Sequence, residues 1–246
     1  MKAPAKINIF LKITGTRGVY HEILSRFVRF EDLSDELTLV PRVDERLVIS
    51  DFNDTIIAKA YDIMAKAGYA GELAEIFRDK SVRLTKRIPV GAGLGGGSSD
   101  AACFMLLVNE FLGLSADELL RLGLKVGADV PFFLSGQSSA NVSGIGEIIE
   151  PFDDDLPALL LVSPDVFCST PEVYAYFRAN LLSKIEPKKA KDMVNLKSDE
   201  LLVEFKNSEL NDLRAACLAL YSELNKPLYL DKFLSGSGSS LFWLKE

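Results

Sequence analysis

The chain has 246 residues and is 48% hydrophobic, enough to bury a large core in one domain or in two closely packed lobes. Its net charge of −7 argues against general nucleic-acid binding, which needs a basic surface. Three widely spaced cysteines indicate a reducing compartment and no zinc cluster. The N-terminus lacks a secretory pattern, and no apolar run approaches the roughly 18 residues of a membrane helix. The sequence therefore predicts a cytoplasmic protein with no membrane partner.

The first predicted element is a strand over residues 3–14, where apolar and polar residues alternate. The alternation gives one apolar face, made by Ile7, Ile9, Leu11 and Ile13. Lys6, Asn8 and Lys12 lie on the other face. Exposed lysine is the norm, so this face is expected to be solvated unless it borders a binding cleft.

A turn at residues 15–19 precedes Tyr20 and His21, and His21 is the only histidine. A lone histidine is often structural, but beside an aromatic residue it could also stack on and hydrogen-bond a base or sugar. Both interpretations stay open. Further strands are predicted at 23–30 and 36–49, with polar turns at 31–35 and 41–46. A helix capped by Asn53 or Asp54 is expected to run from Thr55 to Ala67 and to be ended by Gly68, and a strand over 82–88 follows.

Residues 89–102 read Pro-Val-Gly-Ala-Gly-Leu-Gly-Gly-Gly-Ser-Ser-Asp-Ala-Ala, and an apolar run follows at once. Glycines permit positive φ angles and close approach of a ligand. Ser98 or Ser99 is expected to cap the helix that follows, whose first N–H groups and dipole favour an anion. A flexible linker would lead into polar sequence instead. The segment therefore predicts a phosphate-binding loop.

Other glycine-rich loops fit less well. A P-loop needs a lysine after its last glycine, and none is present. Gly91 to Gly96 match the dinucleotide pattern, and Glu110 lies near the expected acidic position. That acid should end a second strand, whereas Glu110 lies inside the apolar, helical run. The companion motifs of protein kinases are absent.

The second half of the chain begins with a capping box at Ser115, which predicts a helix that ends at Gly127. Asp129 lies between a small residue and an apolar cluster. Capping or turn formation is the commoner role for such an aspartate, but a partly buried carboxylate needs a cationic partner. A hairpin is expected at 138–150, a helix from Ser169, a lysine-rich surface segment at 184–197 and an amphipathic helix at 211–225. The Gly/Ser loop at 235–240 is expected to be built in before a last strand.

The longer string Pro-x-x-x-Gly-Leu-Gly-x-x-Ser-Ser-x-Ala-Ala resembles the ATP loop of the galactokinase, homoserine kinase, mevalonate kinase and phosphomevalonate kinase (GHMP) superfamily. Four further motifs, at residues 4–8, 20–21, 127–131 and 235–238, are similar to the 4-diphosphocytidyl-2-C-methyl-D-erythritol kinase family. This resemblance covers nearly the whole chain. It implies a two-lobed α+β fold with mixed sheets and an active site in the cleft between the lobes. The ATP-binding lobe would span residues 1–155. The substrate-side lobe would span residues 156–246, and its last strand can return to the lobe interface.

The resemblance also implies a reaction: transfer of the ATP γ-phosphate, with Mg²⁺ carried by the nucleotide, to the 2-hydroxyl of 4-diphosphocytidyl-2-C-methyl-D-erythritol in the non-mevalonate isoprenoid route. Asp129 would be the catalytic base and Lys6 its charged neighbour. The implied ATP-binding residues are Lys86, Pro89, Val90, Gly91, Ala92, Gly93, Leu94, Gly95, Gly96, Gly97, Ser98 and Ser99. The implied substrate-binding residues are Asn8, Tyr20, His21, Thr170 and Tyr174. No residue is assigned to bind metal directly.

Two alternatives remain. Another kinase of the superfamily, of the mevalonate or homoserine type, would have no cytosine for Tyr20 and His21 to read. A non-catalytic nucleotide-binding module would have no need of Lys6 and Asp129. The expected partner is a small cytidine diphosphate-linked polyol, and the chain is expected to act as a monomer or weak homodimer.

Overall fold

The computed structural model describes residues 1–50, 55–154 and 156–245. These residues form two compact units that interleave along the chain. Unit 1 holds Met1–Ala5, Phe30–Ile88 and Gly95–Gln137, and unit 2 holds Lys6–Arg29, Pro89–Leu94 and Ser138–Glu246. Neither unit is one continuous stretch, because long strands and the glycine loop each contribute to both. The lobe boundary expected between residues 155 and 156 stays a prediction.

The predicted first strand is confirmed as β1 (Lys2–Arg17), which pairs with β2 (Tyr20–Pro41). Its expected solvated face is wrong, because Lys6 and Lys12 are each only 4% exposed and Asn8 is 1% exposed. The contacts of Lys12 show how a charged side chain can be buried on this face of β1. Its ammonium donates to the carbonyl of Glu209, at 2.9 Å, and to the carboxylate of Asp212. A carboxylate from far along the chain therefore compensates the buried charge.

The predicted turn at 31–35 is also wrong, because β2 runs through it without a break. Residues 23–28 of β2 pair antiparallel with β5 (Ser139–Gly144), and residues 36–41 pair antiparallel with β4 (Lys80–Thr85). The charged stretch lies where β2 passes from one partner to the other, so Glu31 and Asp32 reach solvent within a strand. β3 (Val48–Ile49) pairs parallel with β4, which makes the sheet mixed.

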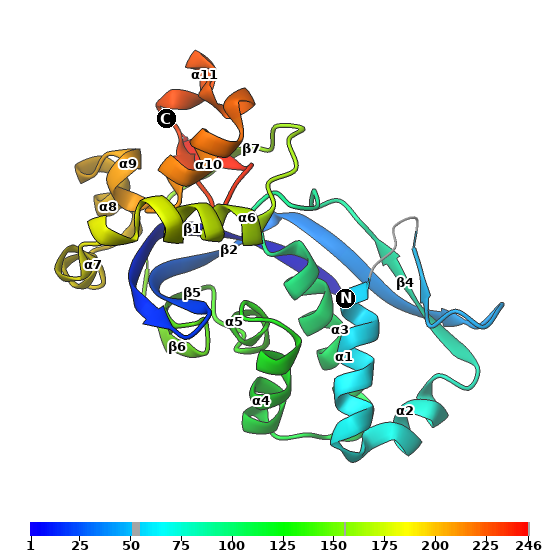
Figure 1. Ribbon diagram of the computed structural model, residues 1–246. Helices are drawn as coiled ribbons and strands as arrows, with labels where there is room; N and C mark the ends of the chain where they lie inside the picture. Colours follow the sequence, from blue (N-terminus) through cyan, green and yellow to red (C-terminus); the bar gives the residue numbers. More distant parts are fainter. Residues whose placement is uncertain (51–54, 155, 246) are drawn as a thin grey trace. The chain divides into compact units, whose positions relative to one another are not determined.

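Unit 1 contains a group of packed helices (Figure 1). They are α1 (Thr55–Met64), the π-helical turn η1 (Ala65–Tyr69), α2 (Ala70–Ile76), α3 (Gly96–Leu112), α4 (Ala116–Val126) and α5 (Val130–Leu134). Helices α1 and α5 each pack on both α3 and α4. Gly68, at φ 114°, produces the kink where a helix end is expected. Ser115 caps α4 as predicted, accepting from the Glu118 N–H at 3.3 Å. The expected caps Asn53 and Asp54 lie outside the described residues.

Unit 2 adds the predicted hairpin, as β5 and β6 (Ile148–Pro151), and a small sheet. In that sheet the last strand, β9 (Leu241–Leu244), lies between β7 (Leu159–Val162) and β8 (Phe233–Leu234). Its helices are α6 (Thr170–Asn180), η2 (Leu182–Lys184), α7 (Pro187–Met193), α8 (Ser198–Glu204), α9 (Asn207–Leu210), α10 (Arg214–Leu220), η3 (Ser222–Asn225) and α11 (Pro227–Leu230). The helix expected over 211–225 is thus two shorter pieces. α6 packs on α10 through Val173, Phe177 and Cys217, all buried.

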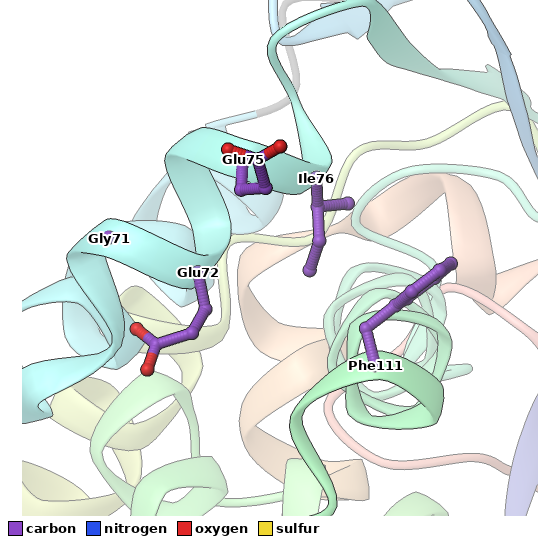
Figure 2. A pocket seen from close by; sticks show the side chains of 5 residues that line it. All are labelled: Gly71, Glu72, Glu75, Ile76 and Phe111. Atoms are coloured by element: carbon purple, nitrogen blue, oxygen red, sulfur yellow. The ribbon is translucent and has the colours of Figure 1, made fainter.

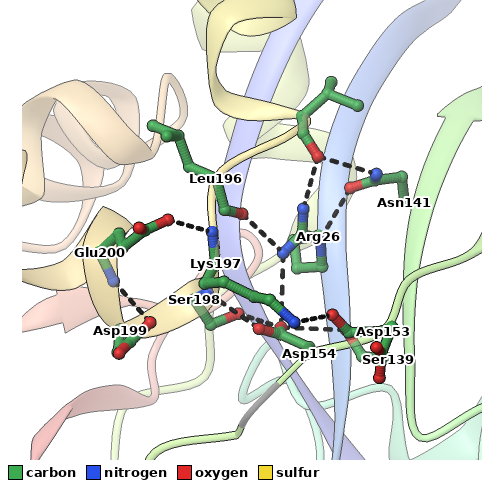
Figure 3. A network of polar contacts seen from close by, with 11 residues as sticks. Arg26, Ser139, Asn141, Asp153, Asp154, Leu196, Lys197, Ser198, Asp199 and Glu200 are labelled. Atoms are coloured by element: carbon green, nitrogen blue, oxygen red, sulfur yellow. Dashed lines mark hydrogen bonds and ion pairs between the residues drawn. The ribbon is translucent and has the colours of Figure 1, made fainter.

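The lysine-rich segment at 184–197 is held by a buried arginine (Figure 3). The Arg26 guanidinium donates to the carbonyls of Val194 and Leu196, at 2.7 and 3.2 Å, and to Asp154 at 3.4 Å. It also lies over the ring of Phe152, 3.4 Å from the ring centre. Burial lowers the pKa of Arg26, and Asp154 opposes that shift. This network fixes the start of α8, because the same Asp154 carboxylate accepts the N–H of Ser198 at 2.9 Å.

Among the helices of the described residues, none combines the length and apolar character needed to cross a membrane.

Candidate active site

The glycine loop adopts the backbone conformation that its composition predicts. Gly91, Gly93 and Gly95 have φ angles of 70°, 75° and 68°, which side chains other than glycine rarely adopt. The expected cap at Ser98 or Ser99 is wrong: α3 begins at Gly96 and its N-cap is the left-handed Gly95. The helix begins two residues before Ser98, at Gly96, so Ser98 and Ser99 both lie in its first turn. The Ser99 hydroxyl is buried there and has no hydrogen-bond partner among the described residues.

Within unit 2 the first half of the glycine loop, Pro89–Leu94, lies against the C-terminal Gly/Ser loop. The Ser240 N–H donates to the carbonyl of Ala92 at 3.0 Å, and the Ser235 hydroxyl donates to the carbonyl of Gly93 at 3.1 Å. Contact at Gly93 is so close that a Cβ there would lie 2.2 Å from the Ser235 carbonyl oxygen. Residues 235–240 are all buried, which confirms that this loop is built in rather than a flexible tail.

Lys6 and Asn8 lie on β1 beside the same two loops. The Lys6 N–H donates to the carbonyl of Leu94 at 2.9 Å, and its ammonium donates to Asn8 Oδ1 at 2.5 Å and to the Gly93 carbonyl at 3.1 Å. The Asn8 N–H donates to the Ser235 hydroxyl at 3.3 Å. Unit 2 therefore joins three segments that are far apart in sequence: the first strand, the loop and the C-terminal loop.

In unit 1, Lys86 belongs to a buried charge cluster. Its ammonium lies 2.5 Å from an Asp35 carboxylate oxygen and 2.6 Å from an Asp100 carboxylate oxygen, and its side chain is 6% exposed. Burial opposes the charge on Lys86, but Asp100 and Asp35 together raise its pKa. The Asp35 carboxylate also accepts the N–H groups of Arg87 and Ile88, at 2.5 and 2.8 Å. The cluster therefore fixes both the approach to the glycine loop and the first turns of α3.

Asp129 occupies the N-cap position of α5, but its side chain makes no capping hydrogen bond. Of the two commoner roles expected for this aspartate, its side chain does not fill that of a cap, whereas its backbone does lie in the turn before α5. Its segment packs near the start of α3: a Cβ on Gly127 would lie 3.6 Å from the Ser98 hydroxyl. Asp129 is half-buried. Because Asp129 belongs to unit 1 and Lys6 to unit 2, their pairing stays a prediction.

His21 packs against aromatic side chains of α6. Its ring centre lies 5.1 Å from that of Tyr174 and 6.0 Å from that of Phe177. His21 is 8% exposed, whereas the neighbouring Tyr20 is 60% exposed. The Nε2 atom of His21 is buried and has no hydrogen-bond partner among the described residues. Burial and then the positive charge of Arg178 lower the pKa of His21, which favours the neutral ring, and a neutral imidazole can both accept and donate a hydrogen bond.

Thr170 begins α6 as the sequence predicts, and its hydroxyl lies 2.8 Å from that of Ser237. This contact links the start of the helix to the C-terminal loop. Of the predicted site residues, Lys86, Gly95–Ser99 and Asp129 belong to unit 1 and the others to unit 2.

Two sets of residues were missed by sequence reasoning. Asp35 and Asp100 hold Lys86, but Asp35 lies in a charged stretch that looks like a turn, so no local signal marks it. Arg178 contacts the turn before His21. It follows Thr170 and Tyr174 at intervals of four residues, and this helical spacing could have revealed it.

A separate groove lies in unit 1 between α2 and the end of α3 (Figure 2). It has a volume of about 520 Å³ and is lined by Gly71, Glu72, Glu75, Ile76 and Phe111. None of these residues belongs to the predicted site. Among the described residues, no group of three or more His, Cys, Asp or Glu side chains is placed to hold a metal ion.

Comparison with known proteins gives a consistent picture. Residues 55–137 match the family model described as the GHMP kinases N terminal domain. The chain is 48% identical to a 4-diphosphocytidyl-2-C-methyl-D-erythritol kinase of Campylobacter jejuni over 98% of both chains. It is 43% identical to one of Sulfurimonas denitrificans, over 100% of this chain and 96% of that one.

Solved structures agree with this relationship. A crystal structure of 4-(cytidine 5'-diphospho)-2C-methyl-D-erythritol kinase superposes with a TM-score of 0.75 at 29% identity, covering 100% of this chain and 90% of that one. Methanococcus jannaschii mevalonate kinase, at 15% identity, matches with a TM-score of 0.54 over 100% of this chain and 90% of its own, which bears on the fold alone.

The fold, with its mixed sheets, helices and glycine loop at the start of α3, is that of the GHMP kinases. Within that class, the full-length identity to named relatives is decisive. The chain belongs to the 4-diphosphocytidyl-2-C-methyl-D-erythritol kinase family.

Proposed function

We propose that this protein transfers the γ-phosphate of ATP to the 2-hydroxyl of 4-diphosphocytidyl-2-C-methyl-D-erythritol, a step in isoprenoid precursor synthesis. The observation that carries the proposal is the group of aromatic rings around His21. The buried His21, whose Nε2 has no hydrogen-bond partner in the described part of the chain, packs against Tyr174 and follows the exposed Tyr20 in sequence. A cytosine offers donors and acceptors at its edge for the histidine and a flat face for the aromatic rings. The names of the relatives support the same substrate.

The residues proposed to hold ATP fit a phosphate. They are Lys86 and the loop from Pro89 to Ser99, which has three left-handed glycines and ends in the first turn of α3. The N–H groups of that turn and the buried hydroxyl of Ser99 are donors suited to a phosphate oxygen. Mg²⁺, when bound with the nucleotide, neutralises the charge on its phosphate oxygens. We expect Lys86 to act near the nucleotide mainly through the position it gives to α3, since two carboxylates hold its ammonium.

Asp129 is proposed as the catalytic base and Lys6 as its charged neighbour. Asp129 would accept the proton of the 2-hydroxyl as the oxygen forms its bond to phosphorus. The carboxylate is half-buried and makes no cap bond, which is consistent with this role. Lys6, held by Asn8 and the Gly93 carbonyl, would favour the ionised form of Asp129 and orient the hydroxyl.

The remaining substrate contacts are proposed for Asn8, Tyr20, His21, Thr170 and Tyr174. Thr170 is exposed and hydrogen-bonded to Ser237 in the C-terminal loop, so its hydroxyl is held in a fixed position. We further propose an ATP-binding lobe at 1–155 and a substrate-side lobe at 156–246, a cytoplasmic location and action as a monomer or weak homodimer. The ligands proposed are small molecules, with no nucleic-acid partner.

ADP release with a panel of acceptors tests the function. The panel contains the diphosphocytidyl substrate, mevalonate, homoserine and galactose. We expect ADP release with the first acceptor alone, because the other three carry no cytosine. Turnover of mevalonate or homoserine would replace the proposal with another GHMP kinase activity. ATP binding without turnover of any acceptor would indicate a non-catalytic nucleotide-binding protein.

A further inference from the structure

Helix α6 presents a row of three polar or aromatic side chains at intervals of four residues: Thr170, Tyr174 and Arg178. An α-helix turns by about 100° and rises about 1.5 Å per residue, so side chains four apart lie on nearly the same face, about 6 Å apart along the axis. Each of the three contacts a different segment of unit 2. Thr170 bonds Ser237, Tyr174 packs on His21, and Arg178 reaches the turn between β1 and β2.

The Arg178 guanidinium binds three successive carbonyl groups of that turn. One terminal nitrogen donates to the carbonyl of Gly18 at 3.2 Å, and the other donates to those of Val19 and Tyr20, both at 3.1 Å. Three consecutive carbonyl groups point at one guanidinium only when the backbone turns sharply between them. Gly18 permits this turn because it adopts a positive φ of 61°. Arginine suits this task because its donors are arranged in a rigid fork.

The turn has little else from α6 to hold it. Val19 is 81% exposed and Tyr20 is 60% exposed, so neither side chain anchors the turn by burial. His21, the next residue, is buried against Tyr174 and Phe177 of the same helix. One helix thus fixes both the ring that packs on His21 and the backbone that carries Tyr20 and His21.

We propose that Arg178 is a positioning residue for recognition of the cytosine base: by binding the carbonyls of residues 18–20 it holds Tyr20 and His21 in register with Tyr174. The inference rests on the proposed function, since it assigns the base to this aromatic group. It predicts a loss specific to the cytidine substrate. ATP binding is expected to change little, because none of the three turn carbonyls belongs to the glycine loop.

The test compares Arg178→Met with Arg121→Met, a matched arginine whose one ion-pair partner in the described part of the chain is Glu118 on its own helix. Arg178→Met should raise the KM for the diphosphocytidyl substrate about tenfold, which corresponds to about 1.4 kcal/mol, and leave the KM for ATP within about twofold. Arg178→Lys keeps a cation that can bind one or two of the carbonyls, so it should recover part of the loss. Equal rises in both KM values, or no change in either, would overturn the assignment.

A second measurement does not depend on turnover. Amide hydrogen exchange at residues 18–21 should be faster in Arg178→Met than in wild type and unchanged in Arg121→Met. Binding of cytidine 5'-diphosphate, measured by calorimetry, should weaken in parallel. If the wild-type protein fails to phosphorylate the diphosphocytidyl substrate, the proposed function fails on its own, and exchange at the turn still decides whether Arg178 holds it. Unchanged exchange would refute the positioning role.

Discussion

Substitution of Gly93 by alanine tests whether the C-terminal loop and the glycine loop fit as closely as the structure indicates. The added Cβ would lie 2.2 Å from the Ser235 carbonyl oxygen and 3.0 Å from that of Gly238, and both atoms belong to the backbone. Neither can move as a flexible side chain would. Gly93 also has a φ of 75°, which costs a side-chain-bearing residue about 1–2 kcal/mol.

Gly136 provides a matched control. It has the same φ of 75°, but a Cβ there would meet nothing within 4 Å. Gly136→Ala should therefore lose only the conformational term, about 1–2 kcal/mol. Gly93→Ala should lose a further ~1–3 kcal/mol from overpacking. Subtracting one variant from the other isolates the cost of the contact with the C-terminal loop.

Urea unfolding of wild type and both variants gives the free energies directly. We also expect the KM for ATP to rise in Gly93→Ala alone, since Gly93 accepts from Lys6 and Ser235 through its carbonyl. Equal destabilisation by the two substitutions would show that the loops do not meet closely at Gly93. The account of the site as an assembly of three distant segments would then fail.

The other predictions concern charged groups. Asp129→Asn should lower turnover about 10²–10⁴-fold while ATP affinity, measured by titration, stays near that of wild type, and unchanged turnover would remove Asp129 from the mechanism. Lys86→Met should lower the free energy of unfolding, measured in urea, by about 3–5 kcal/mol, because it leaves the carboxylates of Asp35 and Asp100 buried without their cation. Adding Asp100→Asn to Lys86→Met should restore part of that stability. A double variant whose loss equals the sum of the two single losses would contradict this explanation. Since burial first and a nearby guanidinium second lower the folded pKa of His21 below its ordinary 6.5, the unfolded chain takes up a proton there before the folded one does. The free energy of unfolding should therefore fall as pH drops below about 6.5 and level off below the folded pKa, and His21→Phe should remove that slope in urea titrations at a series of pH values.

Much of the fold could be predicted because its signals are local. Alternation in residues 3–14 predicted β1, the capping box at Ser115 predicted α4, and Ser169 with its following proline predicted the start of α6. Each signal depends on residues within a few positions of one another. The wrong turn at 31–35 has a non-local cause: β2 is paired with β5 before the charged stretch and with β4 after it, and no local pattern reports those partners.

The candidate site divides in the same way. Its glycine loop was recognisable because glycine is the residue that tolerates positive φ, and the Tyr20–His21 pair stood out by composition. Burial of Lys6 and the charge cluster around Lys86 were not recognisable. A strand with lysines on one face looks solvated until its compensating partners are known.

The sequence by itself determined much of the local structure: where several strands and helices begin, and where glycines give the backbone positive φ angles. Those preferences are properties of φ, ψ and short-range spacing. Only the tertiary structure decided which charges are buried and what neutralises them, as with Lys12 and Asp212, which are 200 residues apart. Such pairings depend on which segments the fold brings within hydrogen-bond distance, and a buried charge is stable only where that has happened.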